Sequence, residues 1–272
     1  MEQPTERSAE TAAPAPSAAS VGTLLDIHDV SRSFGGVLAV DRASAGFVQG
    51  QITGIIGPNG AGKSTLLNLV AGSIRHDSGE IRFDGQEIGS WPAYRRARAG
   101  LGRTFQLSSE FKRLSVMENL LCGTRVARGE TLRGAVLGRR WWGGPQRAAA
   151  ERAMEILTGF GLATKADELA GSLSGGERRL VEIGRALMGE PRLLLLDEPL
   201  AGVHPRNVGR IITALRSLRE SGVTVVTCLH EPDAVERVCD TVVVMSQGSV
   251  IATGTFEDVR ANNEVLGAYL GS

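Results

Sequence analysis

A glycine-rich stretch with a lysine and two hydroxyl residues lies between a predicted strand and a predicted helix. The strand is the apolar run Ile52 to Ile56, and the helix contains Leu66 and Leu67. Glycines let a loop curl so that its backbone N–H groups point at a polyphosphate, and the helix N-terminus adds partial positive charge. The sequence therefore predicts a phosphate-binding P-loop, which consists of Gly57, Pro58, Asn59, Gly60, Ala61, Gly62, Lys63, Ser64 and Thr65.

Two side chains of this loop have separate chemical roles. Lys63 adds a full positive charge to the phosphate site. Ser64 supplies a hydroxyl for the Mg²⁺ that accompanies a nucleotide. The alternative interpretation of the stretch is an ordinary glycine turn, and the rest of the chain decides between the two.

A pair of carboxylates, Asp197 and Glu198, follows a run of four leucines that predicts a buried strand of a parallel sheet. We expect this strand to lie beside the P-loop strand, so that its terminal carboxylates emerge at the phosphate end. Asp197 is then placed to hold Mg²⁺ through water, and Glu198 to polarise the water that attacks a γ-phosphate. The alternative is a solvated acidic pair at a strand end.

A second glycine-containing motif opens a helix that is predicted to run through Leu187. Ser174 and Glu177 have the spacing of a capping box, which by itself needs no glycines. Gly175 and Gly176 lower helix propensity unless a ligand or another chain must approach closely. A helix N-terminus fronted by Ser-Gly-Gly is a second anion site. Because the chain has one P-loop, this second site predicts that two chains pair.

The order of predicted elements indicates an α/β fold. From the P-loop onward strands and helices alternate, which predicts a mostly parallel sheet with helices on both faces. Before the P-loop, residues 24–30, 37–40 and 45–48 predict short antiparallel strands. Residues 107–170 predict a helical insertion, which includes a capping box at Ser115 and Glu118.

The composition, with 42% hydrophobic and 22% charged residues, is typical of a soluble globular protein. No apolar run approaches the roughly 20 residues of a membrane helix, and no signal peptide is visible. We therefore expect a cytosolic protein that reaches a membrane only through a partner. Residues 1–22, rich in Ala, Pro, Ser, Thr and Glu, predict a disordered tail. Cys122, Cys228 and Cys239 are expected to be buried thiols.

Five motifs occur in the order and rough spacing found in the ATP-binding subunits of ABC transporters, and the chain resembles that family from about Leu24 to Gly271. The motifs are Gly57 to Thr65, Gln106, Leu173 to Glu177, Leu193 to Glu198 and His230. The resemblance implies the ABC ATPase fold of a P-loop NTPase: a mostly parallel core sheet, an N-terminal antiparallel β subdomain, and a helical subdomain at roughly 107–190 inserted in a domain of 23–272. It implies hydrolysis of ATP with Mg²⁺.

The resemblance also implies roles for single residues. Phe34 would stack on adenine, and Lys63, Ser64 and Thr65 would contact phosphate and Mg²⁺. Gln106 would reach Mg²⁺ and the attacking water while sensing the membrane partner, and His230 would contact the γ-phosphate. Asp197 would be the metal-bridging carboxylate and Glu198 the catalytic one. The residues that would clamp the ATP of the other subunit are Ser174, Gly175 and Gly176, and the predicted nucleotide-binding set also includes Glu177.

One position departs from the family pattern. After Pro199 the family usually places Asp or Asn at the end of the next loop, whereas this chain has His204. One interpretation is a tolerated polar replacement. The other is that protonation of His204 at mildly acidic pH alters the coupling between two subunits.

Shorter stretches narrow the resemblance. Residues 34–40, 103–106 and 266–271 resemble ATP-binding subunits of branched-chain amino acid importers, a branch with relatives for urea, amides and aromatic acids. Such subunits work with a second ATPase subunit, two membrane permeases and an extracytoplasmic substrate-binding protein, at the cytoplasmic face of the membrane. Arg178, Arg179 and residues 201–203 instead resemble the ATPase of lipopolysaccharide export.

Other classes fit less well. A chromosome-maintenance ATPase needs a long coiled coil between the P-loop and Ser174, and no sustained heptads occur there. A translation factor of the superfamily would carry a second P-loop, and none appears in this sequence. A module that binds nucleotide without hydrolysing it could lose Glu198, which this chain retains. Residues 131–142, rich in Arg and Trp, could meet an anionic membrane surface or form an ordinary surface loop. The zero net charge and the scattered arginines argue against nucleic acid.

Overall fold

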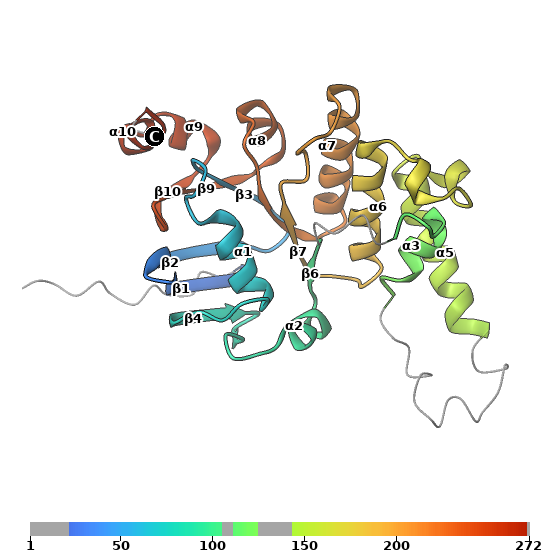
Figure 1. Cartoon of the computed structure of the whole chain (residues 1–272), viewed down its shortest axis with the longest axis horizontal. Helices are drawn as coiled ribbons and strands as arrows, with labels where there is room; N and C mark the ends of the chain where they lie inside the picture. Colours follow the sequence, from blue (N-terminus) through green and yellow to red (C-terminus); the bar gives the residue numbers. More distant parts are fainter. Residues whose placement is uncertain (1–21, 105–110, 125–142, 271–272) are drawn as a thin grey trace, which may run out of the picture.

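The computed structural model of the protein describes residues 22–104, 111–124 and 143–270, which form two sheets and the helices around them (Figure 1). Several predictions fall outside these ranges. They concern the tail of residues 1–21, Gln106 and the Arg- and Trp-rich stretch 131–142. None of the helices within the described ranges has the length and apolar character needed to cross a membrane.

The N-terminal sheet has the antiparallel character that was predicted, and its strand order is β2-β1-β4-β5. Its strands are β1 (Thr23–Phe34), β2 (Val37–Val48), β4 (Ser78–Phe83) and β5 (Gln86–Glu87). The prediction of two strands at 37–40 and 45–48 is wrong, because one strand covers both. Asp29 and Arg42 have φ angles of 47° and 42°, and the register of β1 against β2 shifts beside them. These irregularities bend the paired strands instead of ending them.

The larger sheet has the order β10-β9-β3-β8-β7-β6 and is parallel except for the edge strand β10, which confirms a mostly parallel core sheet. All five residues of each of its three central strands β3, β8 and β7 are buried, as continuous apolar runs predict. The strands are β3 (Ile52–Ile56), β6 (Leu101–Arg103), β7 (Leu193–Asp197), β8 (Thr224–Cys228), β9 (Thr241–Ser246) and β10 (Ser249–Gly254).

The position of β7 differs from the prediction. The strand that carries Asp197 does not lie beside the P-loop strand, because β8 pairs in parallel with β3 on one side and with β7 on the other. Continuous apolar runs identify central strands but do not order them. The carboxyl ends still meet at one edge of the sheet, and helix α1 (Lys63–Ala71), which follows the P-loop, contacts β7.

The helices begin and end largely where the sequence predicts. The capping boxes at Ser115 and Ser174 are both formed, and they begin α3 and α6. Helix α8 was missed, because seven residues are too few for a clear apolar period. The remaining elements are α2 (Ala93–Ala99), α3 (Val116–Leu121), α5 (Gly143–Gly159), η2 (Ala163–Lys165), η3 (Ala170–Ser172), α6 (Gly175–Leu187), α7 (Pro205–Glu220), α8 (Pro232–Val238), α9 (Phe256–Arg260) and α10 (Asn263–Leu270).

Helices α3, α5 and α6 pack against one another at the end of the molecule opposite α9 and α10 (Figure 1). This arrangement agrees with a helical insertion, and its limits at 107 and 190 stay a prediction. Two apolar cores lie on the two faces of the large sheet. Leu194 and Leu196 of β7 belong to one core, and Leu193 and Leu195 to the other. Successive residues of a strand point to opposite faces, so this single leucine run serves both cores.

Arg96 is an arginine whose side chain lies in the core beneath α1, where it is only 2% exposed. Its guanidinium donates to the carbonyl oxygens of Leu69 and Val70 at 2.7 Å each, of Gly89 at 2.9 Å and of Trp91 at 3.1 Å. Burial lowers the pKa of Arg96, against the opposing charge of Glu87. The last carbonyls of a helix have no partner within the helix, and Arg96 satisfies two of them at the end of α1.

We expect Arg96→Met to lower the free energy of unfolding by about 3 kcal/mol, because the carbonyl oxygens of Val70, Gly89 and Trp91 lose this donor while that of Leu69 keeps the N–H of Gly72. Arg95→Met is the matched control, since the Arg95 guanidinium is exposed over the Trp91 ring at 4.0 Å from its centroid. That contact contributes about 0.5–1 kcal/mol. Equilibrium urea unfolding measures both changes, and equal losses in the two variants would contradict a capping role for Arg96.

Candidate active site

The P-loop is held between the two sheets by contacts that only glycine permits. Gly57 has a φ of 148°, and a Cβ there would lie 2.1 Å from the carbonyl oxygen of Met245 in β9. Gly62 has a φ of 96°, and a Cβ there would lie 2.4 Å from the carbonyl oxygen of Ala39 in β2. The loop therefore presents backbone on both sides, as a phosphate cradle requires.

Helix α1 begins directly at this loop. Its N-cap is Gly62, and no described side chain hydrogen-bonds to the first turn as a cap. The N–H groups at the start of a helix have no partner within the helix, and they favour an anion. The N–H groups at the start of α1 are therefore in a position to bind an anionic ligand.

Lys63 lies inside the loop with an exposure of 6%. Its Nζ donates to the carbonyl oxygens of Gly57 at 2.8 Å and Pro58 at 2.9 Å. Burial lowers the pKa of Lys63 below its usual value, against the opposing effect of nearby Glu198 and Asp197. The ammonium group is thus held at the loop by weak neutral acceptors, which a phosphate can replace.

Ser64, in the first turn of α1, and Asp197, at the end of β7, meet at the edge of the sheet even though β3, the strand before the P-loop, and β7 are not neighbours. The Oγ of Ser64 donates to Oδ1 of Asp197 at 3.0 Å, and Asp197 is 5% exposed. In the described ranges no group of three or more His, Cys, Asp or Glu side chains could hold a metal alone. A hydroxyl and one carboxylate fit Mg²⁺, which takes few protein oxygens and completes its shell with phosphates and water.

Arg103, at the end of β6, is a neighbour that sequence reasoning gave no role. Its Nη1 donates to Oδ1 of Asn68 at 2.6 Å, and its Nη2 lies 3.7 Å from Oδ2 of Asp197. Burial lowers the pKa of Arg103, and Asp197 opposes that effect. The sequence gives no clear signal for this role, because the place of Arg103 at the carboxyl end of a parallel strand is known only once β6 is seen to end there.

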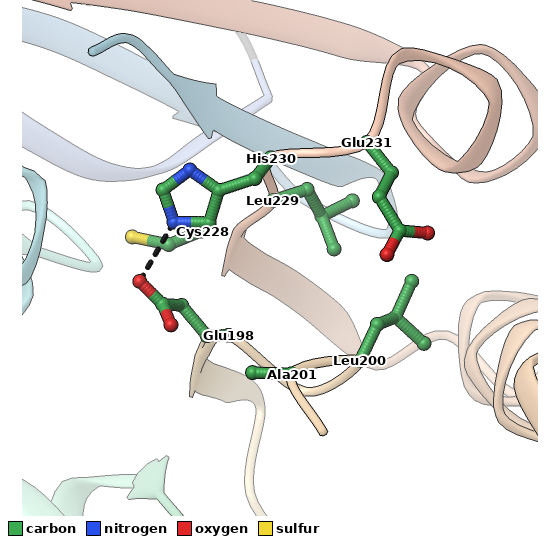
Figure 2. A pocket seen from close by; sticks show the side chains of 7 residues that line it. All are labelled: Glu198, Leu200, Ala201, Cys228, Leu229, His230 and Glu231. Atoms are coloured by element: carbon green, nitrogen blue, oxygen red, sulfur yellow. Dashed lines mark hydrogen bonds and ion pairs between the residues drawn. The ribbon is translucent and has the colours of Figure 1, made fainter. Parts of the chain in front are cut away.

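Glu198 and His230 follow the ends of the adjacent strands β7 and β8, and their side chains point toward each other (Figure 2). Nε2 of His230 and Oε1 of Glu198 are 2.7 Å apart. Glu198 has a φ of 49°, a left-handed conformation that costs a non-glycine residue about 1–3 kcal/mol. The pocket at this pair is lined by Glu198, Leu200, Ala201, Cys228, Leu229, His230 and Glu231.

The motif at the start of α6 is a closed capping box. The Oγ of Ser174 accepts from the N–H of Glu177 at 3.3 Å, and Oε2 of Glu177 accepts from the N–H of Ser174 at 3.0 Å. Oε1 of Glu177 pairs with Nζ of Lys165 at 2.9 Å and lies 3.8 Å from Arg210. Burial works to raise the pKa of Glu177, and the bonds from Lys165 and Ser174 outweigh it, so this pKa is lowered.

The two glycines of this motif have different surroundings. A Cβ on Gly176 would lie 2.6 Å from Cβ of Asn207 in α7, so packing within the chain already requires this glycine. A Cβ on Gly175 would meet its nearest atom at 3.6 Å. Of the two glycines, only Gly175 therefore supports the prediction that a ligand or another chain approaches the start of α6 closely. Within the described parts of the chain, no hydrogen bond or ion pair joins Ser174 or Glu177 to the P-loop.

Phe34 ends β1 with an exposure of 44%. The guanidinium of Arg32 lies 4.7 Å from the centroid of its ring, and Asp77 holds Arg32 at 2.6 Å. The exposed ring can therefore stack on a base while a cation contacts the ring.

His204, the residue that departs from the family pattern, is the N-cap of α7. Its Nδ1 accepts a hydrogen bond from the N–H of Arg206 at 3.3 Å.

The three cysteines are free thiols, as expected, but their burial is uneven. Cys228 is buried at the end of β8, and burial raises the pKa of its thiol. Cys239 is partly buried, and burial raises the pKa of its thiol to about 12. Cys122 is exposed at the C-cap of α3, so the expectation of a buried thiol is wrong there.

This fold and site define a P-loop nucleotide hydrolase. The sequence model of the ABC transporter family matches residues 40–201, which is more than half of the chain. The chain belongs to the ABC transporter family, and it is an ATP-hydrolysing subunit coupled to transport.

Individual relatives agree with this family. The chain is 37% identical to the probable branched-chain amino acid transport ATP-binding protein LivG of Archaeoglobus fulgidus, over 92% of this chain and 96% of that protein. It is 36% identical to the lipopolysaccharide export system ATP-binding protein LptB of Haemophilus influenzae, over 92% and 98%. A solved ATP-binding cassette of an ABC transporter in its ADP conformation is 34% identical, with a TM-score of 0.81 over 93% of this chain and 100% of that one.

Proposed function

We propose that this chain is the ATP-hydrolysing subunit of an importer for branched-chain or related amino acids. The observation that carries the proposal is the 37% identity to LivG over nearly the whole of both chains. The local resemblance of residues 34–40, 103–106 and 266–271 supports it further. The relatives of that branch for urea, amides or aromatic acids are alternative cargoes.

A second candidate is lipopolysaccharide export. It is favoured by the 36% identity to LptB and by the local resemblance of Arg178, Arg179 and residues 201–203. The two candidates differ in their membrane partners and in the direction of transport. They share one ATP site, so the chemistry below holds for both.

ATP binds in this proposal through its phosphates and its base. Lys63 exchanges its bonds to Gly57 and Pro58 for the phosphate oxygens, and backbone N–H groups of the P-loop, to which Pro58 contributes none, surround the same oxygens. The exposed ring of Phe34 stacks on adenine. Ser64, Asp197 and Gln106 would hold Mg²⁺, which when bound would neutralise charge on the phosphates. Gln106 lies outside the described residues, so its part rests on the sequence alone.

Hydrolysis depends on the pair Glu198 and His230. The Glu198 carboxylate accepts the hydrogen bond of the attacking water and orients that water toward the γ-phosphate. The His230 ring holds this carboxylate through the bond of 2.7 Å and contacts the γ-phosphate. Both residues follow parallel strands whose ends meet at the P-loop edge, which supports these roles.

The working unit in this proposal is a pair of ATPase subunits, either two copies or this chain and a related one. Ser174, Gly175 and Gly176 at the start of α6 close over the ATP of the partner subunit, with Glu177 as their cap. Two permeases couple this closure to transport, and an extracytoplasmic binding protein delivers the cargo. The chain is then a peripheral protein at the cytoplasmic face of the membrane.

Purification of the tagged chain from detergent-solubilised membranes of its host tests the cargo. We expect two permeases and a second ATPase subunit to co-purify. After reconstitution into vesicles with the matching binding protein, leucine uptake should require ATP. Co-purification with lipopolysaccharide export components would contradict amino-acid import. Reconstituted vesicles that hydrolyse ATP but take up no amino acid would contradict it as well.

Pairing of subunits makes a separate prediction for the purified chain. Below its dimerisation constant the chain should bind ATP yet hydrolyse it poorly, because each site lacks its clamp. Turnover per chain should therefore rise in proportion to chain concentration in that range. Steady-state ATPase assays over a dilution series, with the dimer fraction measured by analytical ultracentrifugation, check this. Turnover per chain that stays constant across the monomer–dimer transition would contradict the shared site.

A further inference from the structure

Arg179, in the second turn of α6, joins that helix to the turn that carries Glu198. Its Nη2 donates to the backbone carbonyl oxygen of Glu198 at 3.0 Å. Its Nη1 pairs with Oε2 of Glu182 at 2.7 Å. The side chains of Arg179 and Glu182 are only 16% and 8% exposed. A planar guanidinium can make both bonds in one fixed geometry, which an ammonium group cannot do.

The carbonyl group that Arg179 contacts belongs to a strained residue. Glu198 has a φ of 49°, and such a conformation persists in a non-glycine residue only where its surroundings hold it. Two donors hold it here, because the N–H of Ala201 also donates to this oxygen at 3.1 Å. The Ala201 bond is local and belongs to the turn. The Arg179 bond ties the main chain of this turn to helix α6.

The direction of the Glu198 side chain follows from this backbone. The peptide after Glu198 is fixed by the two donors, and the left-handed φ turns the side chain toward His230, which it meets at 2.7 Å. A right-handed or extended φ would point the Cβ of Glu198 elsewhere. The contact of Arg179 with the main chain of Glu198 therefore helps to determine the position of the Glu198 carboxylate.

We infer that Arg179, held in place by Glu182, is a positioning residue that keeps Glu198 in the conformation from which its carboxylate reaches the attacking water. This inference rests on the proposed role of Glu198. It has a structural corollary: α6 begins at Ser174 and the two glycines, so the helix proposed to clamp the partner's ATP also bonds to the turn that holds the base.

The contact positions Glu198 and does not tune its charge. Arg179 and Glu182 form an ion pair at 2.7 Å, and Arg179 contacts the main-chain carbonyl oxygen of Glu198 and not its carboxylate. Loss of the pair should therefore change the rate of hydrolysis and leave the shape of its pH profile unchanged. A residue that only stabilised the fold would lower turnover only in proportion to the unfolded fraction.

The test uses the full chain and three variants. Arg179→Met removes the contact but leaves Glu182 buried without its partner, so Arg179→Met with Glu182→Gln removes both charges together. Arg179→Lys keeps the positive charge and N–H donors but loses the planar fork of the guanidinium. We expect kcat of the double variant to fall about tenfold to a hundredfold, the loss caused by a misplaced catalytic group. KM and the Kd of a fluorescent ATP analogue should stay within about twofold. Arg179→Lys should recover part of kcat.

Arg147→Met is the control for loss of an arginine, because Arg147 is exposed on α5 and pairs only with Glu151 at 3.1 Å in the described structure. Its kcat should equal that of the unmodified chain. In a Glu198→Gln background, the Arg179 and Glu182 changes should lower turnover no further, since they act through Glu198.

Glu198→Gln measured alone separates the inference from the proposed function. Unchanged kcat in the Arg179 variants beside a large loss in Glu198→Gln would overturn the positioning role and leave the base in place. A loss that appears in the Kd for ATP, or that disappears once the unfolded fraction is subtracted, would overturn the positioning role as well. Unchanged turnover in Glu198→Gln would overturn both.

Discussion

Glu198→Gln is expected to lower ATP turnover by about 10²–10⁴-fold, the usual contribution of a positioned general base. The amide is nearly isosteric with the carboxylate, and it can still contact His230, which lies 2.7 Å from Oε1. It cannot accept a proton from water at neutral pH. ATP binding should persist, because Lys63 and the P-loop are untouched. Steady-state phosphate release and equilibrium binding of a fluorescent ATP analogue measure the two effects separately.

Glu236→Gln is the matched control for this change. Glu236 is an exposed residue of α8, so the substitution removes the same charge without touching the pocket. Its turnover should equal that of the unmodified chain. If Glu198→Gln kept a turnover within about threefold of that value, Glu198 would not be the base.

Lys63→Met is expected to weaken ATP binding by about a hundredfold, because a charge-assisted bond to phosphate contributes about 1.5–3 kcal/mol. The fold should tolerate the change. Only two loop carbonyls, at 2.8 and 2.9 Å from Nζ, lose a donor, and methionine keeps most of the stem. Isothermal titration calorimetry with ATP measures the affinity, and urea unfolding checks the fold. An affinity within about threefold of the original would contradict the phosphate role of Lys63.

The lowered pKa of Lys63 adds a pH dependence of known sign. Burial makes Lys63 lose its proton at a lower pH than a free lysine does. A bound polyphosphate raises that pKa again, so ATP binding takes up protons in the alkaline range, and affinity falls as pH rises there. Lys63→Met should flatten this alkaline limb. Calorimetry in buffers of different ionisation enthalpy detects the proton uptake directly.

The motifs could be predicted from the sequence because each one joins a local backbone requirement to a reactive side chain. Residues 57–65 predict a loop between strand and helix, and the structure has β3 before this stretch and α1 beginning within it, at Lys63. The capping boxes at Ser115 and Ser174 predict the first residues of α3 and α6 correctly. The pairing of Glu198 with His230 follows once both residues are known to end parallel strands.

What could not be predicted depends on contacts between distant parts of the chain. The order β3-β8-β7 requires β8 to insert between two strands that precede it in sequence, and apolar runs do not record this. Gly176 is explained by Asn207 of α7, which no local pattern indicates. Arg179 looks like any helical arginine until Glu198 is placed 3.0 Å away. Pro232 was the one local signal of α8, since proline favours the first helical position.

The close contacts of the P-loop glycines determine how substitutions at this site can be interpreted. A methyl group on Gly57 would meet β9, and one on Gly62 would meet β2, so either change disturbs the packing of the loop against a sheet as well as the loop itself. Gly60, with no other atom within 4 Å of a Cβ, lacks such a neighbour. Loss of ATP binding in a Gly57 or Gly62 variant therefore does not distinguish a damaged nucleotide site from a misfolded protein. Side-chain changes such as those at Lys63 and Glu198 report on the chemistry alone.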